Sequence, residues 1–388
     1  MQNFFYDIDT HVHFGKGQIE QLGRAVRRQG RRALLVYGGG SIKKSGLYDE
    51  AMKSLSEAGV SVAELSGVEP NPRVATVAKG VQICREQDVE VVVPIGGGSS
   101  IDCAKVIAGA AFYEGDPWDL VTGQAAYTEF LPIVAVLTLA ATGSEMDAVA
   151  VISNPDSRDK LGTRHPAMRP KAAIMDPSYT FSVSPYQTAA GTADIMSHVM
   201  ENYFWHDVGA HLQDRMAEAL LKTCLKYGEI ACSQPDNYEA RANLMWAGSH
   251  AINGLISLGK AHPWSVHPIE HPLSAYYDIT HGAGLAILTP AWMRQILNGH
   301  TVDKFVDFAV NVFGLAPGGD KFATAQAGID ALYGYFKNRL RLPMTLSEVG
   351  IDERHFDAMA EKAVAGGLDE AYQKLDVAAV KAIYTACR

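Results

Sequence analysis

Aspartate and histidine side chains recur in this chain at spacings that suit a metal site. Asp194 and His198 stand four residues apart in a segment that reads as helix, so both side chains project from one helical face. His267 and His271 have the same spacing, and His281 follows nearby. One carboxylate and three imidazoles form a ligand set for Fe²⁺ or Zn²⁺ that leaves room for a substrate oxygen. A single histidine is more often a capping or core residue, so it is the grouping that predicts a metal centre.

A glycine-rich turn joins a predicted buried strand to a helix. The β-branched run 89–95 is typical of a strand buried on both faces, and Gly96, Gly97, Gly98 and Ser99 follow it directly. Glycines let backbone N–H groups approach a phosphate, and the start of the next helix adds partial positive charge. The turn therefore predicts a phosphate site. A tight turn without any ligand is the alternative interpretation.

An earlier turn of the same kind bears on the choice of cofactor. In a doubly wound sheet, the end of the first strand lies near an adenosine ribose. NAD usually needs a carboxylate there, whereas this turn offers Gly38, Gly39 and Ser41, followed by Lys43 and Lys44. Room and positive charge favour a 2′-phosphate, so we predict NADP(H) over NAD(H). The alternative is that the lysines are solvated residues at the start of a helix.

The elements that must position these residues fall into two kinds. Short apolar runs alternate with helical patterns in the first half: strand 32–37, helix 47–57, strand 61–65, helix 74–87, strand 89–95, helix 101–111 and strand 131–139. This rhythm predicts an α/β domain over residues 1–183, with a Rossmann-like, doubly wound parallel sheet. The segment 151–177 reads as a hairpin and loop. Long helical patterns predict an all-α domain over residues 184–388: 189–205, 211–227, 238–258, 303–312, 321–340 and 353–365.

Composition excludes several classes of protein. The 388 residues are 47% hydrophobic and carry a net charge of −9, so no general positive field exists to bind nucleic acid or an anionic membrane. The five cysteines are scattered and form no C-x-x-C pair, which argues against a disulfide framework or a cysteine-bound zinc. Neither a signal peptide nor a membrane-spanning run is evident. We therefore expect a cytoplasmic protein.

Several motifs, taken in order, resemble one known family. They are Gly96-Gly97-Gly98-Ser99 with Asp102, Ala141-Thr142-Gly143-Ser144-Glu145, Asp194 with His198, His267 with His271-Pro272-Leu273, and His281-Gly282. Together they resemble the iron-containing (group III) alcohol dehydrogenase family over nearly the whole chain. The butanol dehydrogenase and NADPH-dependent aldehyde reductase branch shares further motifs: Tyr37-Gly38-Gly39-Gly40-Ser41, Lys43-Lys44, Gly67-Val68-Glu69-Pro70-Asn71-Pro72 and Asp116-Pro117-Trp118.

The resemblance implies roles for single residues and a dehydroquinate synthase-like fold. The residues that resemble the family's metal ligands are Asp194, His198, His267 and His281. His271 resembles the non-ligand histidine beside the nicotinamide, and we take it as the catalytic proton relay. The expected cofactor contacts are Gly97, Gly98, Ser99, Asp102, Thr138, Thr142 and Lys160, with Asn71 added from the branch motif. Glu270 stands where many members carry a small residue. We interpret it as a local variation, and the alternative is that it alters the charge beside the metal.

These observations predict a metal-dependent, NAD(P)-linked alcohol dehydrogenase or aldehyde reductase acting on small substrates such as butanol and butanal. The metal would act as a Lewis acid on the substrate oxygen, and hydride would pass to or from the nicotinamide. The resemblance also implies a homodimer. The alternatives are a polyol (glycerol-type) dehydrogenase, a dehydroquinate synthase-like lyase, a metallohydrolase and a non-catalytic binding protein. The lyase needs basic residues around the metal, and the segments around Asp194, His267 and His281 are poor in them.

Overall fold

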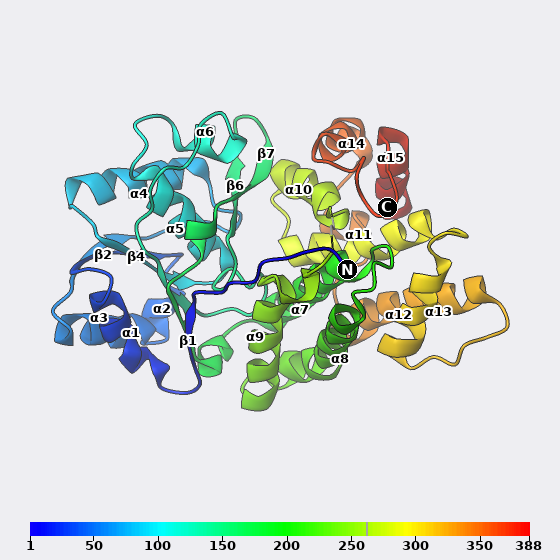
Figure 1. The fold of residues 1–388 in the computed structure, drawn as a ribbon, viewed down its shortest axis with the longest axis horizontal. Coiled ribbons are helices and arrows are strands. Elements are labelled where there is room, and N and C mark those ends of the chain that lie inside the picture. The colour runs from blue at the N-terminus through cyan, green and yellow to red at the C-terminus, as the bar shows by residue number, and fades with distance from the viewer. Residues whose placement is uncertain (261–262) are drawn as a thin grey trace. The chain divides into compact units, whose positions relative to one another are not determined.

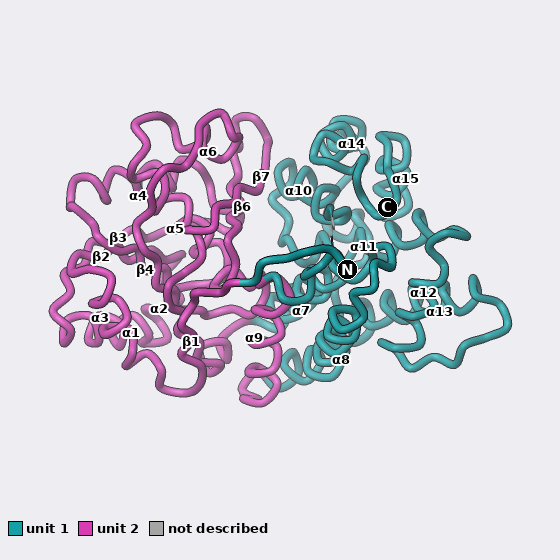
Figure 2. Tube along the Cα trace, viewed as in Figure 1, with its two compact units in different colours: residues 1–6, 184–234, 254–388 teal, residues 7–183, 235–253 magenta. Residues whose placement is uncertain are grey.

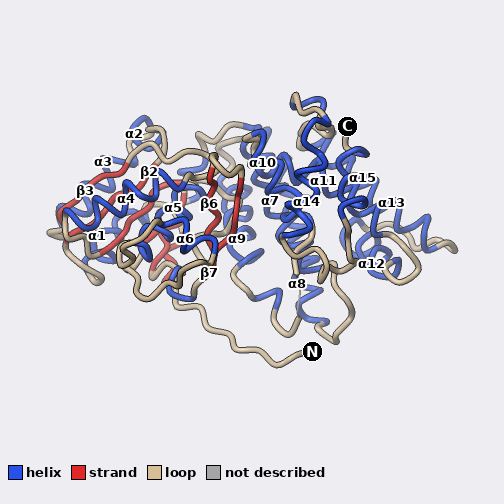
Figure 3. Tube along the Cα trace, turned by 90° about the horizontal axis from the view of Figure 1, so that it is seen from above, coloured by secondary structure: helices blue, strands red, loops and turns tan. Residues whose placement is uncertain are grey.

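The computed structural model describes residues 1–260 and 263–388, and contacts within it divide the chain into two compact units. The unit that we call the sheet unit consists of residues 7–183 and 235–253 (Figure 2). The unit that we call the helical unit consists of residues 1–6, 184–234 and 254–388. Every strand among the described residues belongs to the sheet unit (Figure 3).

Because of one helix, the sheet unit consists of two separate segments of the chain. The units change between residues 183 and 184, where the sequence also suggests a boundary, but helix α9 (Tyr238–Ile252) groups with the sheet unit. Its Met245 joins a buried cluster that includes Ile101 and Leu137. A Cβ added to Gly143 would lie 2.5 Å from the carbonyl oxygen of Gly248 on the same helix. Close packing therefore ties α9 to the sheet unit.

A six-stranded parallel sheet forms the centre of the sheet unit (Figure 1). Its strands are β1 (His11–Phe14), β2 (Arg32–Tyr37), β3 (Ser61–Leu65), β4 (Val91–Gly96), β5 (Val134–Leu137) and β8 (Ala172–Met175). They lie in the order β1-β8-β5-β4-β2-β3, and every neighbouring pair is parallel. Tyr37 of β2 lies opposite Ile95 of β4, so the turns that follow both strands leave the same edge of the sheet. This arrangement confirms the predicted parallel α/β fold.

Alternate side chains of the strands face two different layers of helices. The helices of this unit before α9 are α1 (Leu22–Arg27), α2 (Ser41–Lys44), α3 (Leu47–Glu57), α4 (Val74–Glu86), α5 (Gly98–Ala110) and α6 (Pro117–Thr122). Leu34 of β2 belongs to a buried cluster that it shares with α4 and α5. Leu35, the next residue, belongs to a second cluster that it shares with α1 and α3. Both faces of the sheet are therefore covered, as a parallel sheet requires.

The remaining strands of the sheet unit form a separate antiparallel pair. Strands β6 (Val149–Asn154) and β7 (Asp159–Arg164) pair directly, and this hairpin begins two residues before the segment 151–177 in which the sequence predicts one. Two of the sheet's strands, β1 and β8, are not among the predicted strands, and β8 lies in the segment 151–177 that the sequence predicts to be a hairpin and loop. Helix α5 begins at Gly98, three residues earlier than the sequence suggests. The glycine-rich turn is thus shorter than expected, and its last glycine is already helical.

The helical unit is built from eight α-helices among its described residues. They are α7 (Pro185–Tyr203), α8 (His211–Ser233), α10 (Val266–Tyr277), α11 (His281–Ile296), α12 (Val302–Phe313), α13 (Lys321–Gly334), α14 (Phe356–Ala365) and α15 (Val377–Ala386). The predicted all-helical character of this region is confirmed, although α10, α11 and α15 are not among the predicted helices. Across both described parts of the chain, no helix is long and apolar enough to cross a membrane.

Candidate functional site

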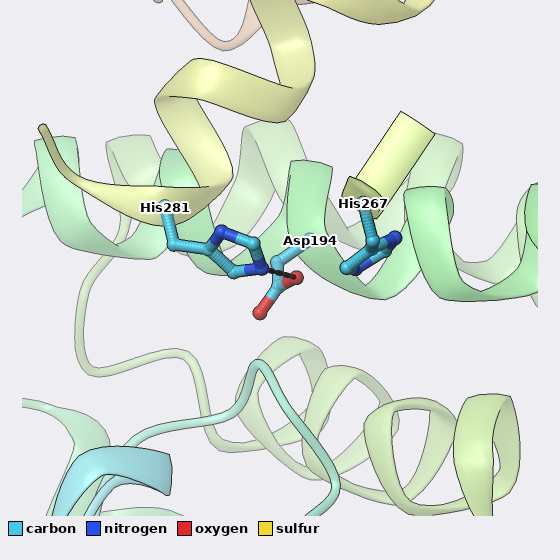
Figure 4. A group of neighbouring side chains, drawn as sticks. All are labelled: Asp194, His267 and His281. Carbon is cyan, nitrogen blue, oxygen red and sulfur yellow. Dashed lines mark ion pairs between the residues drawn. The ribbon is translucent and has the colours of Figure 1, made fainter. Parts of the chain in front are cut away.

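Three side chains from three helices of the helical unit meet in one cluster. Asp194 comes from α7, His267 from the first turn of α10, and His281 from the first residue of α11. Each offers an oxygen or nitrogen ligand atom, and these atoms all lie within 4.8 Å of one another. Nε2 of His281 lies 3.8 Å from a carboxylate oxygen of Asp194, and His267 lies on the other side of that carboxylate (Figure 4). This spacing suits a single divalent ion.

His198 joins the same cluster from α7, one turn after Asp194. Its Nε2 lies 3.7 Å from Oδ1 of Asp194, and its ring stacks on that of His267 with a centroid separation of 4.7 Å. Burial, followed by the nearby His267 and His281, lowers the pKa of His198 well below its usual value. The imidazole is therefore neutral at neutral pH, which is the form that binds metals. The structure thus brings together all four residues that the sequence suggests as ligands.

The hydrogen bonds of His267 fit a metal ligand. Its Nδ1 lies 3.0 Å from Oε1 of Glu201, and both side chains are buried. Its Nε2 is also buried but has no hydrogen-bond partner among residues 1–260 and 263–388. A histidine that binds a metal usually donates one ring N–H to a carboxylate or carbonyl and presents its other nitrogen to the metal. The residues present therefore fit a divalent cation.

His271 lies beside this cluster, one turn further along α10 than His267. Its ring centroid is 5.8 Å from that of His281 and 6.2 Å from that of His267. Glu270, His271 and His281 also form a second group of close ligand atoms. The position next to the cluster suits a residue that exchanges protons with a bound molecule.

In the sheet unit, the glycines of the turn between β4 and α5 are closely surrounded by other atoms. A Cβ added to Gly96 would lie 2.4 Å from Oγ of Ser100, and a Cβ added to Gly98 would lie 2.4 Å from Oγ1 of Thr142. Packing within the unit thus accounts for these two glycines. No side chain of the described residues caps the start of α5, and the N–H groups of Ser100 and Ile101 donate to the carbonyl of Gly97. The N–H groups of Gly98 and Ser99 are therefore the ones placed to bind an anion.

Other predicted cofactor residues gather around the turn between β4 and α5. The backbone N–H of Thr138 donates to the carbonyl of Gly96 at 2.9 Å. The carboxylate of Asp102 accepts from Oγ of Ser144 at 2.6 Å and from the N–H of Val151 at 2.9 Å. Burial raises the pKa of Asp102 to about 6. Asp102 therefore links α5 to the 141–145 segment and to β6.

The turn after β2 is open rather than crowded. A Cβ added to Gly39 or Gly40 would meet no atom within 4 Å. The ammonium group of Lys43 lies 3.9 Å from a carboxylate oxygen of Glu64, which also accepts the hydroxyl of Tyr37 at 2.7 Å. A carboxylate that the sequence does not reveal therefore lies beside the predicted positive charge.

Asn71 and Lys160 are two further predicted cofactor residues. Asn71 adopts a left-handed backbone with φ of 53° and precedes Pro72. The carbonyl of Pro72 accepts from the N–H of Ser153 at 2.8 Å, and Ser153 lies opposite Lys160 in the β6–β7 pair. The two residues therefore flank the same position of β6, although they are far apart in sequence.

Several buried charged residues have contacts that the sequence does not reveal. Glu201 contacts a predicted ligand, and a signal for it exists, because residues 194, 198 and 201 follow one helical face. Lys105 and Asp147 form a buried ion pair in the sheet unit, and Glu145 accepts a hydrogen bond from Ser249 of α9. No spacing rule links the members of the last two pairs.

Comparison with known proteins gives matches over most of the chain. A family model described as iron-containing alcohol dehydrogenase matches residues 9–177, and one described as the C-terminal part of the Fe-containing alcohol dehydrogenase family matches residues 188–387. NADH-dependent butanol dehydrogenase A of Clostridium acetobutylicum is 56% identical over 94% of this chain and 93% of its own length. The NADPH-dependent aldehyde reductase YqhD of Escherichia coli is 36% identical over the full length of both.

A solved structure supports the same assignment. The crystal structure of NADH-dependent butanol dehydrogenase A from Thermotoga maritima matches with a TM-score of 0.94 and 38% identity, covering 100% of this chain and 99% of the other. The two family models together span both halves of the chain, including the turn after β4 and the aspartate–histidine cluster. The chain belongs to the iron-containing alcohol dehydrogenase family.

Proposed function

We propose that this protein is an NAD(P)H-linked alcohol dehydrogenase that interconverts small primary alcohols and aldehydes, such as butanol and butanal. We further propose that Asp194, His198, His267 and His281 hold one divalent ion, Fe²⁺ or Zn²⁺. The observation that carries the proposal is the cluster of Asp194, His267 and His281, in a chain that belongs to this family. Relatives at 56% and 57% identity are named butanol dehydrogenases, which supports the substrate class.

When bound, the ion supplies a Lewis acid for the substrate oxygen and the nicotinamide supplies or accepts the hydride. The chain's own residues hold and orient these groups. Asp194 contributes a negative charge, and the neutral ring of His198 contributes a nitrogen without adding repulsion. His271 lies next to the cluster without belonging to the Asp194 group, and its imidazole is suited to carry the proton that the alcohol and aldehyde exchange.

For the cofactor, the uncapped first turn of α5 is the proposed pyrophosphate site. The N–H groups of Gly98 and Ser99 lie in that turn, where the helix dipole favours an anion. Gly97, Asp102, Thr138 and Thr142 surround or support the same turn. The neighbouring turn, with Gly38, Gly39 and Ser41, is the proposed adenosine end of the site, because β2 and β4 are adjacent and parallel.

The preference for NADPH over NADH stays a prediction. The open space at Gly39 and Gly40 supports room for a 2′-phosphate. Against a strong preference, the charge of Lys43 lies near the Glu64 carboxylate, and the relatives at 56% and 57% identity are named NADH-dependent. We propose that the enzyme accepts both nucleotides and that Glu64 moderates the attraction of Lys43 for a third phosphate group.

The decisive experiment follows oxidation of NADPH or NADH with butanal, using protein as purified, after chelation, and after addition of Fe²⁺ or Zn²⁺. We expect turnover that chelation abolishes and one of the two metals restores. Asp194→Asn should lose both bound metal and turnover. The control is Asp357→Asn, which changes an exposed carboxylate of the same unit outside the cluster. Turnover unaffected by chelation, or no turnover with either nucleotide and either metal, would reject the proposal.

A further inference from the structure

Glu270 is a completely buried carboxylate at the edge of the metal cluster. It lies on α10 with 0% of its surface exposed. One carboxylate oxygen contacts Nδ1 of His281, and the other accepts the hydroxyl of Ser274, one turn further along α10. Glu270 thus connects α10 to the first residue of α11, and it does so through the ring of a proposed metal ligand.

The neighbouring helix makes room for this carboxylate. Gly284 lies on α11 opposite Glu270, and a Cβ added there would lie 2.9 Å from Oε1 of Glu270. Any larger residue at position 284 would press on the carboxylate. The pairing of a large acidic residue on one helix with a glycine on the other shows that the two positions fit each other.

Burial of a carboxylate is costly unless its charge is matched. The contact with Nδ1 of His281 leaves the other ring nitrogen, Nε2, 3.8 Å from a carboxylate oxygen of Asp194. A cation at the cluster would therefore lie on the far side of an imidazole whose near side contacts Glu270. The positive charge of the cation would offset the charge of Asp194 directly and that of Glu270 through the ring of His281.

Glu201 forms a comparable pair with His267, but it also accepts hydrogen bonds from the backbone. Its carboxylate accepts the backbone N–H groups of Ser265, Val266 and His267 at 2.7 to 2.9 Å, as well as contacting Nδ1 of His267. Glu201 therefore caps α10 in addition to orienting a ligand. Glu270 instead contacts two side chains, those of His281 and Ser274, so a change at Glu270 tests the orientation of the ligand directly.

We propose that Glu270 is a positioning residue of the metal centre. By accepting the Nδ1–H of His281, it fixes the tautomer in which Nε2 faces Asp194, and its charge strengthens the hold of the cluster on a divalent cation. The inference rests on the metal site of the proposed function. It assigns a specific role to Glu270, which we interpreted from the sequence as a local variation.

The test compares metal binding by Glu270→Gln with binding by the unmodified chain. Metal-free protein is titrated with Zn²⁺ against a chelator of known affinity, and the absorption spectrum of the Co²⁺-loaded protein is recorded. We expect Zn²⁺ to bind about 10 to 100 times more weakly in the variant, as is typical when such a partner of a ligand is lost. The Co²⁺ bands should shift, because the orientation and basicity of one ligand change.

A matched control separates this role from general damage to the fold. Glu218 is also buried in the helical unit and accepts from Tyr203 at 2.8 Å and from Arg215 at 2.6 Å, away from the cluster. Glu218→Gln should lower the thermal stability of the metal-free protein while leaving Zn²⁺ affinity unchanged. Glu270→Gln should leave the stability of the metal-free protein equal to or above that of the unmodified chain, because it removes a buried charge. Should the glutamine variant fail to fold, Glu270→Leu serves for the same comparison.

The outcomes distinguish the two proposals. If the unmodified chain binds neither Zn²⁺ nor Co²⁺, the metal site of the proposed function is wrong. If the unmodified chain binds metal and Glu270→Gln binds it within twofold as tightly with the same Co²⁺ spectrum, only the role of Glu270 is overturned. An equal loss of affinity in Glu218→Gln would also overturn it, since the effect would then not depend on contact with His281.

Discussion

Glu145 is a buried carboxyl group whose protonation should be visible in the stability of the protein. It is 1% exposed and accepts a hydrogen bond from the hydroxyl of Ser249. Burial raises the pKa of Glu145 from 4.5 to about 7, and the bond from Ser249 opposes this only in part. Between these two values the folded chain retains a proton that the unfolded chain has lost. The free energy of unfolding should therefore decrease as pH rises from about 4.5 to 7, and this contribution should be constant above that range.

Glu145→Gln is expected to remove this pH dependence. Urea unfolding at pH 5 and at pH 7.5 should show a steeper loss of stability in the unmodified chain than in the variant. The difference should be about 2 kcal/mol, since each pH unit contributes at most about 1.4 kcal/mol and the contribution falls off near both pKa values. The control is Glu129→Gln, which changes an exposed residue of the same unit. If the variant and the unmodified chain lose stability in parallel over this range, Glu145 does not titrate there.

The sequence suggests the proposed metal ligands more readily than the residues that contact them. Asp194 and His198 are found because four residues make one helical turn. Glu201 lies on that same face of α7, so the same spacing rule applies to it. Glu270 and His281 are eleven positions apart and on different helices, so their contact depends on how α10 and α11 pack. Spacing rules describe neighbours on one helix and do not describe partners on two.

At the scale of elements, prolines explain why the sequence did not predict two helices that carry proposed ligands. Helix α10 contains Pro272 and α11 contains Pro290, and an interior proline usually argues against a helix. In α10 the backbone N–H groups at the start are held by Glu201, which compensates locally. Both helices are also packed into the unit, since Leu273 and Leu285 are fully buried. Tertiary contacts therefore outweigh the local signal.

The close crossing of α7 and α11 places Asp194 near His281. A Cβ added to Gly282 would lie 2.0 Å from the carbonyl oxygen of Ala190, one turn before Asp194 on α7. Since this neighbour is backbone, it cannot move aside cheaply. The absence of a side chain at Gly282 therefore allows the two helices to approach one another.

Gly282→Ala is expected to force α11 away from α7. Overpacking of this kind typically costs about 1 to 3 kcal/mol of stability, and here it should also weaken Zn²⁺ binding because His281 moves with α11. Thermal unfolding and Zn²⁺ titration measure the two effects. Gly299→Ala is the matched control, since a Cβ there would meet no atom within 4 Å. A variant with unchanged stability and unchanged affinity would show that the crossing does not determine the geometry of the cluster.

At the scale of the whole molecule, the sequence predicts the fold of each half better than it predicts which helices belong to which unit. Strand 32–37, helix 47–57 and strand 61–65 are found at the predicted residues, because alternating periodicities are local properties. Helix α9 follows α8 directly in the sequence, and nothing local marks its Met245 as part of a cluster with Ile101. Assignment of a helix to a unit depends on long-range packing that a single sequence does not display.

Metal removal should loosen one unit and leave the other unchanged. The proposed ligands lie on α7, α10 and α11, so an ion would cross-link three helices of the helical unit. Zn²⁺ at a free concentration of 100 times its dissociation constant would raise the free energy of unfolding by about 2.7 kcal/mol. Hydrogen–deuterium exchange should therefore be faster in peptides from these helices after chelation, and unchanged in peptides from β2 and β4. Faster exchange throughout the chain, or in β2 and β4 alone, would contradict the assignment of the metal to this cluster.

The ribosome delivers β8, the last strand of the parallel sheet, long before it delivers α9. Until Met245 emerges, the side chains of Ile101 and Leu137 have no partner from α9 and remain an apolar surface on a growing chain. Such surfaces attract chaperones and other nascent chains at this stage. His281 emerges later still, so it can join Asp194 and His267 only after the whole of the sheet unit has been synthesised. The discontinuity in the sheet unit thus sets an order of assembly: the sheet unit, with the proposed nucleotide site, can be completed before the proposed metal ligands of the helical unit come together.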